Sequence, residues 1–563
     1  MKQKNTLFWL GFTALFPVSS YSQGIGDQRI VIEKERSVTI PQANRVLDKV
    51  PLTKGSQETF KLNYSFFDRK PTGLETVDFQ PSVIAPTTTS KSTKKETAYA
   101  NQVRLGAGNF GRTFGEVYIN SPQNEKLIIG FHGLHNAAKR GPIQDINSGN
   151  SKNSIRLDGQ YNAGKFKLSS QIGYERRLAN FYGYDSSFVK LERADIKQAV
   201  NTFQFGVGFQ NSNPSSKVDY QVKSTINQIS DLLAAEELDW ATDISFSYPI
   251  MEDKLVAKLD AEAYRMQRKD NYIDFPVRDR NLFRLMPKFL FNYNQLAVTA
   301  GVRAVNEFDE IGKISRTKGF PVVDITYKTP SLLYFSVGYD GDIIRNTLGS
   351  MLRENPFLMP QVNLLNTDKL QEFYISSKGE VTTGLNYQFR ASFGKYQNLF
   401  FFVTNDLSNE NAILLRNFDI QYENERTNFA QFDVQVNYQP VDLWRTNLKA
   451  QYNYYEVKSF DRPFHRPSVE VYWGNTLTVS DKLIANVQLF HLGGLYATDP
   501  FSFTEPIKKL VPIFDLNSEL TYLINQQFGV FVKMNNLLGK NYQRYIYYPQ
   551  QGLNFLVGVN ISL

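Results

Sequence analysis

The chain has 563 residues, of which 14% are aromatic, and a formal net charge of +8. It contains no cysteine, which excludes disulfides and thiol chemistry, and its basic residues occur mostly singly or in pairs, so no nucleic-acid role is assigned. The length would suffice for two to four soluble domains, but the sequence shows no boundary between such domains.

The first 22 residues are predicted to be an export signal peptide. Two lysines precede an apolar core at residues 7–16, and Ser20 and Ser22 have the spacing of a cleavage site before Gln23. No cysteine follows the core, so lipoprotein processing is excluded. Residues 23–100 are rich in Pro, Thr, Ser and Lys with little alternation, which predicts an irregular segment in the periplasm or in the interior of the protein.

From residue 101 to residue 563, hairpin follows hairpin. Ten short turns alternate with eleven longer or more polar connections, which predicts about 22 strands and places both ends on the short-turn side. The expected fold is all-β, a transmembrane antiparallel up-and-down β-barrel whose short turns face the periplasm. A string of soluble β-sandwiches is the alternative, but its turns would not sort into short and long sets.

Two segments illustrate the period of two. In residues 255–263 the apolar Leu255, Ala257 and Leu259 alternate with charged residues, and the same pattern appears in residues 514–522. Because a charge facing lipid costs energy, the charged faces are predicted to line the lumen. The lumen-facing candidates are Lys258, Asp260, Glu262, Asp515 and Glu519.

The last strand supports closure of the barrel. Apolar residues occupy every second position from Leu553 to Leu563, and the chain ends flush with this strand. An outer-membrane barrel is closed by pairing its last strand with its first, so the C-terminal strand is expected to pair near residue 101.

The C-terminal region resembles the closing strands of TonB-dependent receptors of the outer membrane of Gram-negative bacteria. This resemblance rests on an Asn-Leu pair, an aromatic loop, and a Pro and a Gly before the last strand. It also rests on three residues of an earlier loop and strand. These residues are Asn536, Leu537, Tyr542, Pro549 and Gly552, and Asn355, Pro356 and Glu372.

The chain departs from that family in lacking a plug domain and a convincing TonB box, since residues 23–100 are too short for a full plug. The resemblance therefore implies a plug-less relative of the receptor family. A barrel of 22 strands encloses a wide lumen that is normally filled. The candidates to fill it are part of 23–100, predicted to be 45–95, inward-folded loops such as 341–370, or a separate protein.

Other motifs give no cofactor, metal or catalytic site. The GxGxxG motif at Gly106, Gly108 and Gly111 is followed by a strand instead of a helix, so it is interpreted as a hairpin. His132 and His135 are three residues apart on a predicted strand and face opposite sides, whereas His465 and His491 are isolated. No Ser and His pair with an acidic partner stands out, so the chain is not expected to be an enzyme.

Two aromatic clusters, at residues 180–188 and 542–549, have two interpretations. In the first interpretation the rings stack on sugars or dock a partner. In the second, which is favoured, they form a girdle at the membrane interface. The predicted function is solute uptake or passage across the outer membrane, and the alternative is a structural or assembly component of an outer-membrane complex with a blocked lumen. The expected partners are outer-membrane lipid and an accessory outer-membrane or surface lipoprotein.

The first testable expectation concerns location. The mature chain should begin at Gln23, fractionate with the outer membrane and migrate differently on gels before and after heating, because a folded barrel resists denaturation by detergent. Recovery of the chain in the cytosol with Met1 intact would contradict the signal-peptide and barrel predictions.

Overall fold

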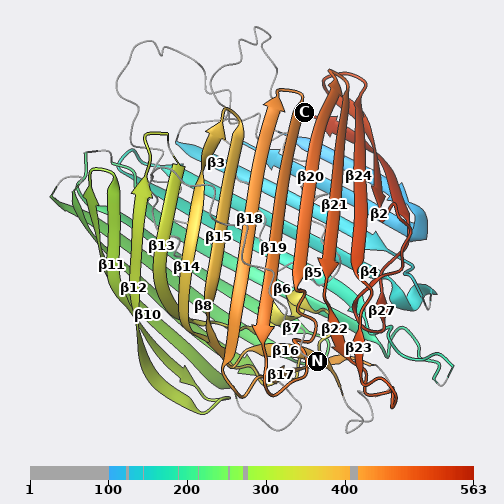
Figure 1. The fold of residues 1–563 in the computed structure, drawn as a ribbon. Coiled ribbons are helices and arrows are strands. Elements are labelled where there is room, and N and C mark those ends of the chain that lie inside the picture. Colours follow the sequence, from blue (N-terminus) through green and yellow to red (C-terminus); the bar gives the residue numbers. More distant parts are fainter. Residues whose placement is uncertain are drawn as a thin grey trace, which may run out of the picture.

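The computed structural model describes residues 101–563 except 122–125, 144, 188, 214, 252–253, 270–276, 332 and 406–415. The predicted signal peptide (1–22) and irregular segment (23–100) lie outside the described residues. Twenty-two strands form one antiparallel sheet that closes on itself (Figure 1), which confirms the predicted barrel and its strand number.

The strands that make up the barrel wall follow one another around the ring in chain order. They are β1 (Gln102–Gly108), β2 (Arg112–Asn120), β3 (Leu127–Ala138), β4 (Asn150–Asn162), β5 (Phe166–Asn180), β6 (Lys197–Asn211), β7 (Asp219–Asp231), β8 (Glu236–Met251), β9 (Leu255–Lys269), β10 (Arg278–Tyr293), β11 (Leu296–Asp309), β12 (Ile314–Lys328), β13 (Leu333–Ile344), β14 (Thr367–Thr382), β15 (Leu385–Gln397), β18 (Thr427–Val441), β19 (Trp444–Glu456), β20 (Val469–Ser480), β21 (Leu483–Gly493), β24 (Ile513–Leu523), β25 (Phe528–Asn535) and β28 (Asn554–Ser562).

The ring closes between β1 and β28. Seven residue pairs join these strands, from Gln102 opposite Ser562 to Gly108 opposite Leu556. Beyond the strand ends, the N–H of Leu563 donates to the carbonyl oxygen of Asn101 at 2.9 Å. The C-terminal strand therefore pairs next to residue 101, as its alternation predicts.

The connections sort into two sets at opposite ends of the barrel. The short turns share one end with Asn101 and Leu563, and the longer connections lie at the other (Figure 1). The longer set holds the small elements: η2 (Asn109–Gly111), η3 (Asp145–Ser148), α4 (Leu348–Glu354), β16 (Phe400–Thr404), β17 (Phe418–Tyr422), β22 (Tyr496–Thr498), β23 (Ile507–Lys509), β26 (Gln543–Tyr545) and β27 (Tyr548–Pro549). In outer-membrane barrels the longer loops are extracellular.

The two faces of the wall differ in polarity. Large apolar side chains such as Leu259, Phe246 and Phe283 are 42–49% exposed on the outside. The intervening residues carry the ion pairs, for example Arg303 with Asp340. No described helix is long and apolar enough to cross a membrane. A closed barrel with an apolar exterior and polar interior places the protein in the outer membrane.

The glycine and histidine motifs occupy wall positions. Gly108 ends β1, and a Cβ on it would lie 1.9 Å from the carbonyl oxygen of Phe555, so a side chain has no room there. His132 stacks on Tyr118 beside Glu116, whereas His135 is exposed on the outside next to Asn153. The structure therefore has a hairpin at the GxGxxG motif and places the two histidines on opposite faces.

A substitution on the outer face tests the orientation of the wall. Leu259→Arg should lower the free energy of unfolding by about 2–4 kcal/mol near the bilayer midplane, because the guanidinium would lie in hydrocarbon. Unfolding in urea from lipid vesicles measures this change. Lys258→Arg, on the other face of β9, is the control and should leave stability nearly unchanged; equal tolerance at both positions would contradict the assigned orientation.

Candidate functional site: the loop layer at the mouth of the barrel

Most of the longer loops fold together instead of projecting into solvent. Five of them share one hydrophobic cluster of buried residues, to which the short β7–β8 connection adds Ala235, and a further long loop packs against it through His465. We call these six segments, in their described residues, the loop layer: 181–196, 345–366, 398–426, 457–468, 494–512 and 536–553. A hydrophobic core at this end of the barrel makes the loop layer a folded unit.

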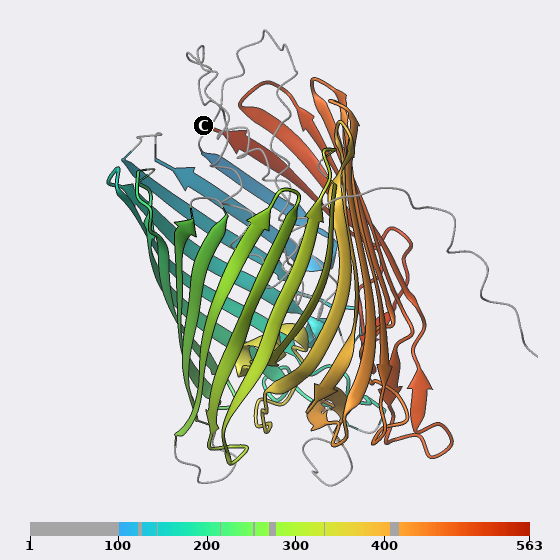
Figure 2. The same ribbon diagram turned by 60° about the vertical axis from the view of Figure 1, so that its left-hand side comes forward.

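The loop between β13 and β14 is the centre of the loop layer, and Figure 2 shows its helix α4, in yellow, between the walls of the barrel. Thr347 caps α4 by accepting from the N–H of Ser350 at 3.0 Å, and the Ser350 hydroxyl accepts from the N–H of Thr347. Leu348, Met351 and Leu352 are buried. The helix presents its apolar side chains to the core of the loop layer.

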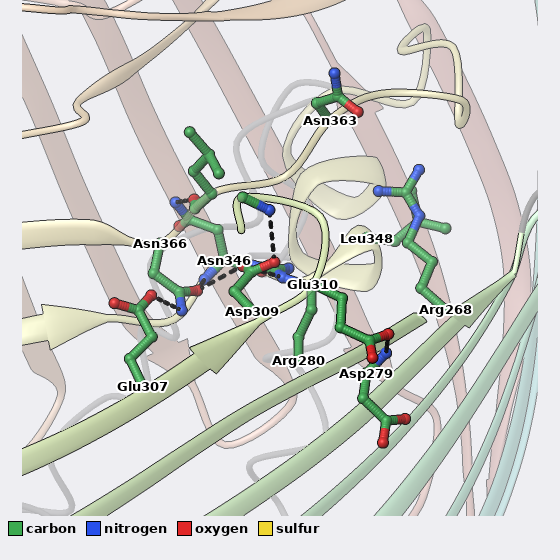
Figure 3. Close-up of polar contacts among 12 residues, drawn as sticks. Arg268, Asp279, Arg280, Glu307, Asp309, Glu310, Asn346, Leu348, Asn363 and Asn366 are labelled. Carbon is green, nitrogen blue, oxygen red and sulfur yellow. Dashed lines mark hydrogen bonds and ion pairs between the residues drawn. The ribbon is translucent and has the colours of Figure 1, made fainter. Parts of the chain in front are cut away.

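Two arginines of the wall hold this loop (Figure 3). Arg280 on β10 donates to the carboxylate of Asp309 at 2.7 Å, to the carbonyl oxygen of Asn346 at 2.9 Å and to the side chain of Asn366 at 3.1 Å. Arg268 on β9 donates to the carbonyl oxygens of residues 360 and 362 at 2.5 and 2.6 Å. Both ends of the loop are thereby attached to the inner wall.

The buried carboxylate of Glu237, at the start of β8, adds a third attachment. It accepts from the N–H groups of Leu348 and Gly349 at 2.8 and 3.2 Å. These N–H groups belong to the first turn of α4 and have no partner within the helix, so the wall supplies the acceptors that the helix lacks.

The same loop contacts the connection between β25 and β28. The ring of Phe357 stacks on Tyr548 at 3.7 Å between centroids, and the hydroxyl of Tyr545 donates to the carbonyl oxygen of Glu354 at 2.8 Å. Strands β10 and β25 are eleven positions apart in either direction around the ring of 22. The contacts from Arg280 to Tyr548 therefore cross the lumen.

Further contacts join the remaining loops to this crossing. The N–H of Phe418 donates to the carbonyl oxygen of Phe357 at 3.1 Å. The hydroxyl of Tyr182 donates to the carbonyl oxygen of Pro549 at 3.0 Å. The hydroxyl of Thr404 in β16 donates to the carbonyl oxygen of Thr498 in β22 at 2.8 Å. Aromatic rings and main-chain hydrogen bonds thus interlock the loops.

His465 is buried where three loops meet. Its ring lies 5.2 Å from those of Phe418 and Tyr545, and Arg544 donates to its carbonyl oxygen at 2.6 Å. Burial, together with the charge of Arg544, lowers the pKa of His465 to about 3. The imidazole is neutral at physiological pH.

The lumen-facing candidates fall into two groups that the structure does not bring together. Lys258, Asp260 and Glu262 lie on β9, and Asp515 and Glu519 lie on β24, eleven positions away around the ring. The two walls therefore do not form one charged site.

Neighbouring side chains of the wall neutralise most of these charges. Asp260 pairs with Lys288, and Glu262 with Arg284, each at 2.5 Å. Glu519 pairs with Arg104 at 2.5 Å and with Lys533 at 3.3 Å. Asp515 instead accepts from the hydroxyl of Tyr542, in the loop layer. The paired carboxylates therefore need no charged occupant of the lumen to neutralise them.

The interpretation of the aromatic clusters as an interfacial girdle is wrong. Phe181, Tyr182, Tyr545 and Tyr548 are buried in the core of the loop layer, so they neither face lipid nor offer a free surface for sugars. The sequence shows aromatic loops but not their mutual packing, which joins segments hundreds of residues apart.

Residues behind the family resemblance have structural roles in the same layer. Asn536 adopts a left-handed backbone (φ 49°) and its amide donates to the carbonyl oxygens of Lys540 and Gln551 at 2.6 and 2.8 Å. Asn355 is fully buried and accepts from the N–H of Phe357. These residues fix loop geometry.

The likeness to known proteins lies in the fold. No protein-family model matches the chain, and no curated protein is similar in sequence. Among solved structures, the ferric-catecholate import receptor Fiu from E. coli K12 superposes with a TM-score of 0.61 at 9% identity, covering 82% of this chain and 81% of that one.

Two further solved structures agree. The siderophore receptor PirA from Acinetobacter baumannii gives a TM-score of 0.61 at 11% identity, covering 84% of this chain and 81% of that chain. The FrpB iron transporter from Neisseria meningitidis gives 0.62 at 8% identity, with coverage of 84% and 82%. The chain has the barrel fold of outer-membrane import receptors.

The neutral state of His465 makes the loop layer sensitive to acid. An exposed histidine gains a proton near pH 6.5, but the buried ring resists protonation to about pH 3. As the pH falls from 6.5 to 5, the opened form binds a proton that the closed form does not, which weakens closure by at most about 2 kcal/mol. Hydrogen exchange of the loop amides measures this loss.

His465→Asn provides the control, because asparagine tolerates the left-handed backbone at this position (φ 56°) and does not titrate in this range. Burial raises the pKa of Glu354, so protonation of its carboxyl at falling pH stabilises the closed form. This effect is the same in both proteins and cancels when their acid sensitivities are compared. The same acid sensitivity in His465→Asn and the unaltered protein would contradict this role of His465.

Proposed function

We propose that the protein takes part in solute uptake across the outer membrane, as a plug-less relative of TonB-dependent receptors whose loop layer is the gate. The observation that carries this proposal is the chain of contacts from Arg280 to Tyr548, which crosses the mouth of a polar lumen. Because the chain contains no cysteine, no disulfide fixes the loop layer in its closed form.

The difference in polarity between the loop layer and the lumen wall below it supports a gate. Below the loop layer the wall carries ion pairs such as Arg303 with Asp340, and a polar surface suits the passage of a hydrated solute. The apolar core of the loop layer excludes water when it is closed. The likeness to import receptors favours this function at the level of the fold.

The second candidate function is that of a structural component of an outer-membrane complex with a permanently blocked lumen. The depth of the aromatic core favours it. Phe357, Phe418, Tyr545 and Tyr548 are each at most 2% exposed, and opening the loop layer would expose them to water at a cost of several kcal/mol. An accessory lipoprotein would fit either function as a lid or as the partner in the complex.

Conductance in planar bilayers separates these functions. Leu358 and Phe418 pair as an isolated β-bridge between two loops, so cysteines at both positions lie within reach of a disulfide. A gate should open transiently in KCl, fall silent when Leu358→Cys/Phe418→Cys is oxidised, and recover with reductant. The same protein under reducing conditions is the matched control, because the chain has no other cysteine.

Two variants, a loop replacement and a deletion, identify what blocks the lumen. If the loop layer does so, replacing residues 346–364 by a short Gly-Ser linker should give a steadily open channel. Silence of the unaltered protein and the reduced double-cysteine protein, with conductance only after this replacement, would show a permanent block and favour the structural role. Conductance after deletion of 45–95 alone would show that the N-terminal segment, proposed above as the occupant, seals the barrel.

A further inference from the structure

The outer face of the barrel has a notch at about the middle of its strands, for example at Ala261 and Ala263 of β9 (Leu255–Lys269). It has a volume of about 340 Å³ and runs across β8 to β12. Its walls are the outward-facing Ile244, Phe283 and Leu285, each 41–49% exposed, and its floor includes Ala261 and Ala263. Among the lining residues only Glu262 and Arg284 belong to the inner face. The notch therefore opens toward the membrane.

The strand register explains its shape. On the outer face Ala263 lies between Thr242 and Phe283, and Ala261 lies between Ile244 and Leu285. Each alanine contributes one methyl group between larger neighbours. The two alanines follow each other along β9, so the resulting slot runs along the strand, which in outer-membrane barrels is tilted by about 35–45° from the membrane normal.

A basic and an aromatic residue stand at the extracellular end of this slot. Arg265 is the next outward residue of β9 and lies between Trp240 on β8 and Asn281 on β10. Its side chain is 58% exposed, and its ion pair with Asp279, at 3.8 Å, is longer than a hydrogen bond. The indole N–H of Trp240 donates to Ser224 at 2.8 Å, which fixes the ring.

This arrangement fits a lipid at the membrane interface. Arg265 lies four residues from the extracellular end of β9, and tryptophan is enriched where hydrocarbon meets headgroups. A cationic guanidinium at that level attracts phosphate, with two donors in a fork that matches phosphate oxygens. The volume of the notch lies at the lower end of the range for ligand pockets, which suits one chain of a lipid.

We infer that the notch binds one outer-leaflet lipid, with an acyl chain in the slot over Ala261 and Ala263 and a phosphate-bearing anionic headgroup at Arg265. Lipid is the occupant because this face is within the membrane, and the guanidinium selects an anionic headgroup over a zwitterionic one. The bound lipid stays with the wall irrespective of whether the loop layer opens.

Native mass spectrometry of the full chain tests this site. Protein released from nanodiscs of equal parts phosphatidylglycerol and phosphatidylcholine should retain one phosphatidylglycerol. Ala263→Phe fills the slot and should abolish retention, whereas Ala257→Phe, outward on the same strand but outside the notch, should not. Arg265→Gln should lower the preference for phosphatidylglycerol about fivefold, and Arg176→Gln, an exposed arginine on β5, should leave it unchanged.

Heat-modifiable migration shows which variants are folded, and only folded ones are compared. Retention by Ala263→Phe equal to that of the unaltered protein would overturn the site. Equal losses in Ala257→Phe and Ala263→Phe would show that lipid binds the wall without a specific slot. An unchanged headgroup preference in Arg265→Gln would remove Arg265 from the proposal, and retention of free phosphate in place of lipid would contradict it.

Discussion

The structure depends on one constraint: within hydrocarbon every backbone N–H and carbonyl group needs a partner inside the protein. A sheet satisfies this only by closing, and here the closure rests on the seven residue pairs between β1 and β28. Once the ring is closed, every second side chain faces lipid and the others face inward. The exposed Leu259 beside Lys258, and the ion pairs of Asp260 and Glu262, follow directly from that geometry.

Closure with 22 strands creates a second problem, because the ring is too wide for its own side chains to fill. The loop layer meets this problem at the extracellular end with a small hydrophobic core of its own. That core needs attachment on several sides, and Arg268, Arg280, Glu237 and Asp515 provide it from the wall. Charged residues at the ends of the strands thus support an apolar core between them.

The sequence predicts the wall and not the loop layer, for a physical reason. Alternation is local, so Leu255, Ala257 and Leu259 reveal the face of β9 within a few residues. The contact of Arg280 with Asn346 spans 66 residues, and that of Tyr545 with Glu354 spans 191, without any periodic signal. Aromatic rings are common both in an interfacial girdle and in a buried core, so composition alone could not place Tyr548. Lys258 and Glu519 were recognisable as charged positions, but their location on opposite walls required the closed ring.

The contacts that join β10 to the loop beyond β25 also have a mechanical consequence. A wide ring of strands is a hoop that can ovalise in two independent ways, and a tie along one diameter resists only one of them. Flattening that stretches or shortens the line from Arg280 to Tyr548 strains the tie, whereas ovalisation with its axes at 45° to that line leaves its length unchanged. The contacts along this line therefore stiffen the cross-section against one mode of ovalisation, and resistance to the other mode depends on the remaining loops of the loop layer.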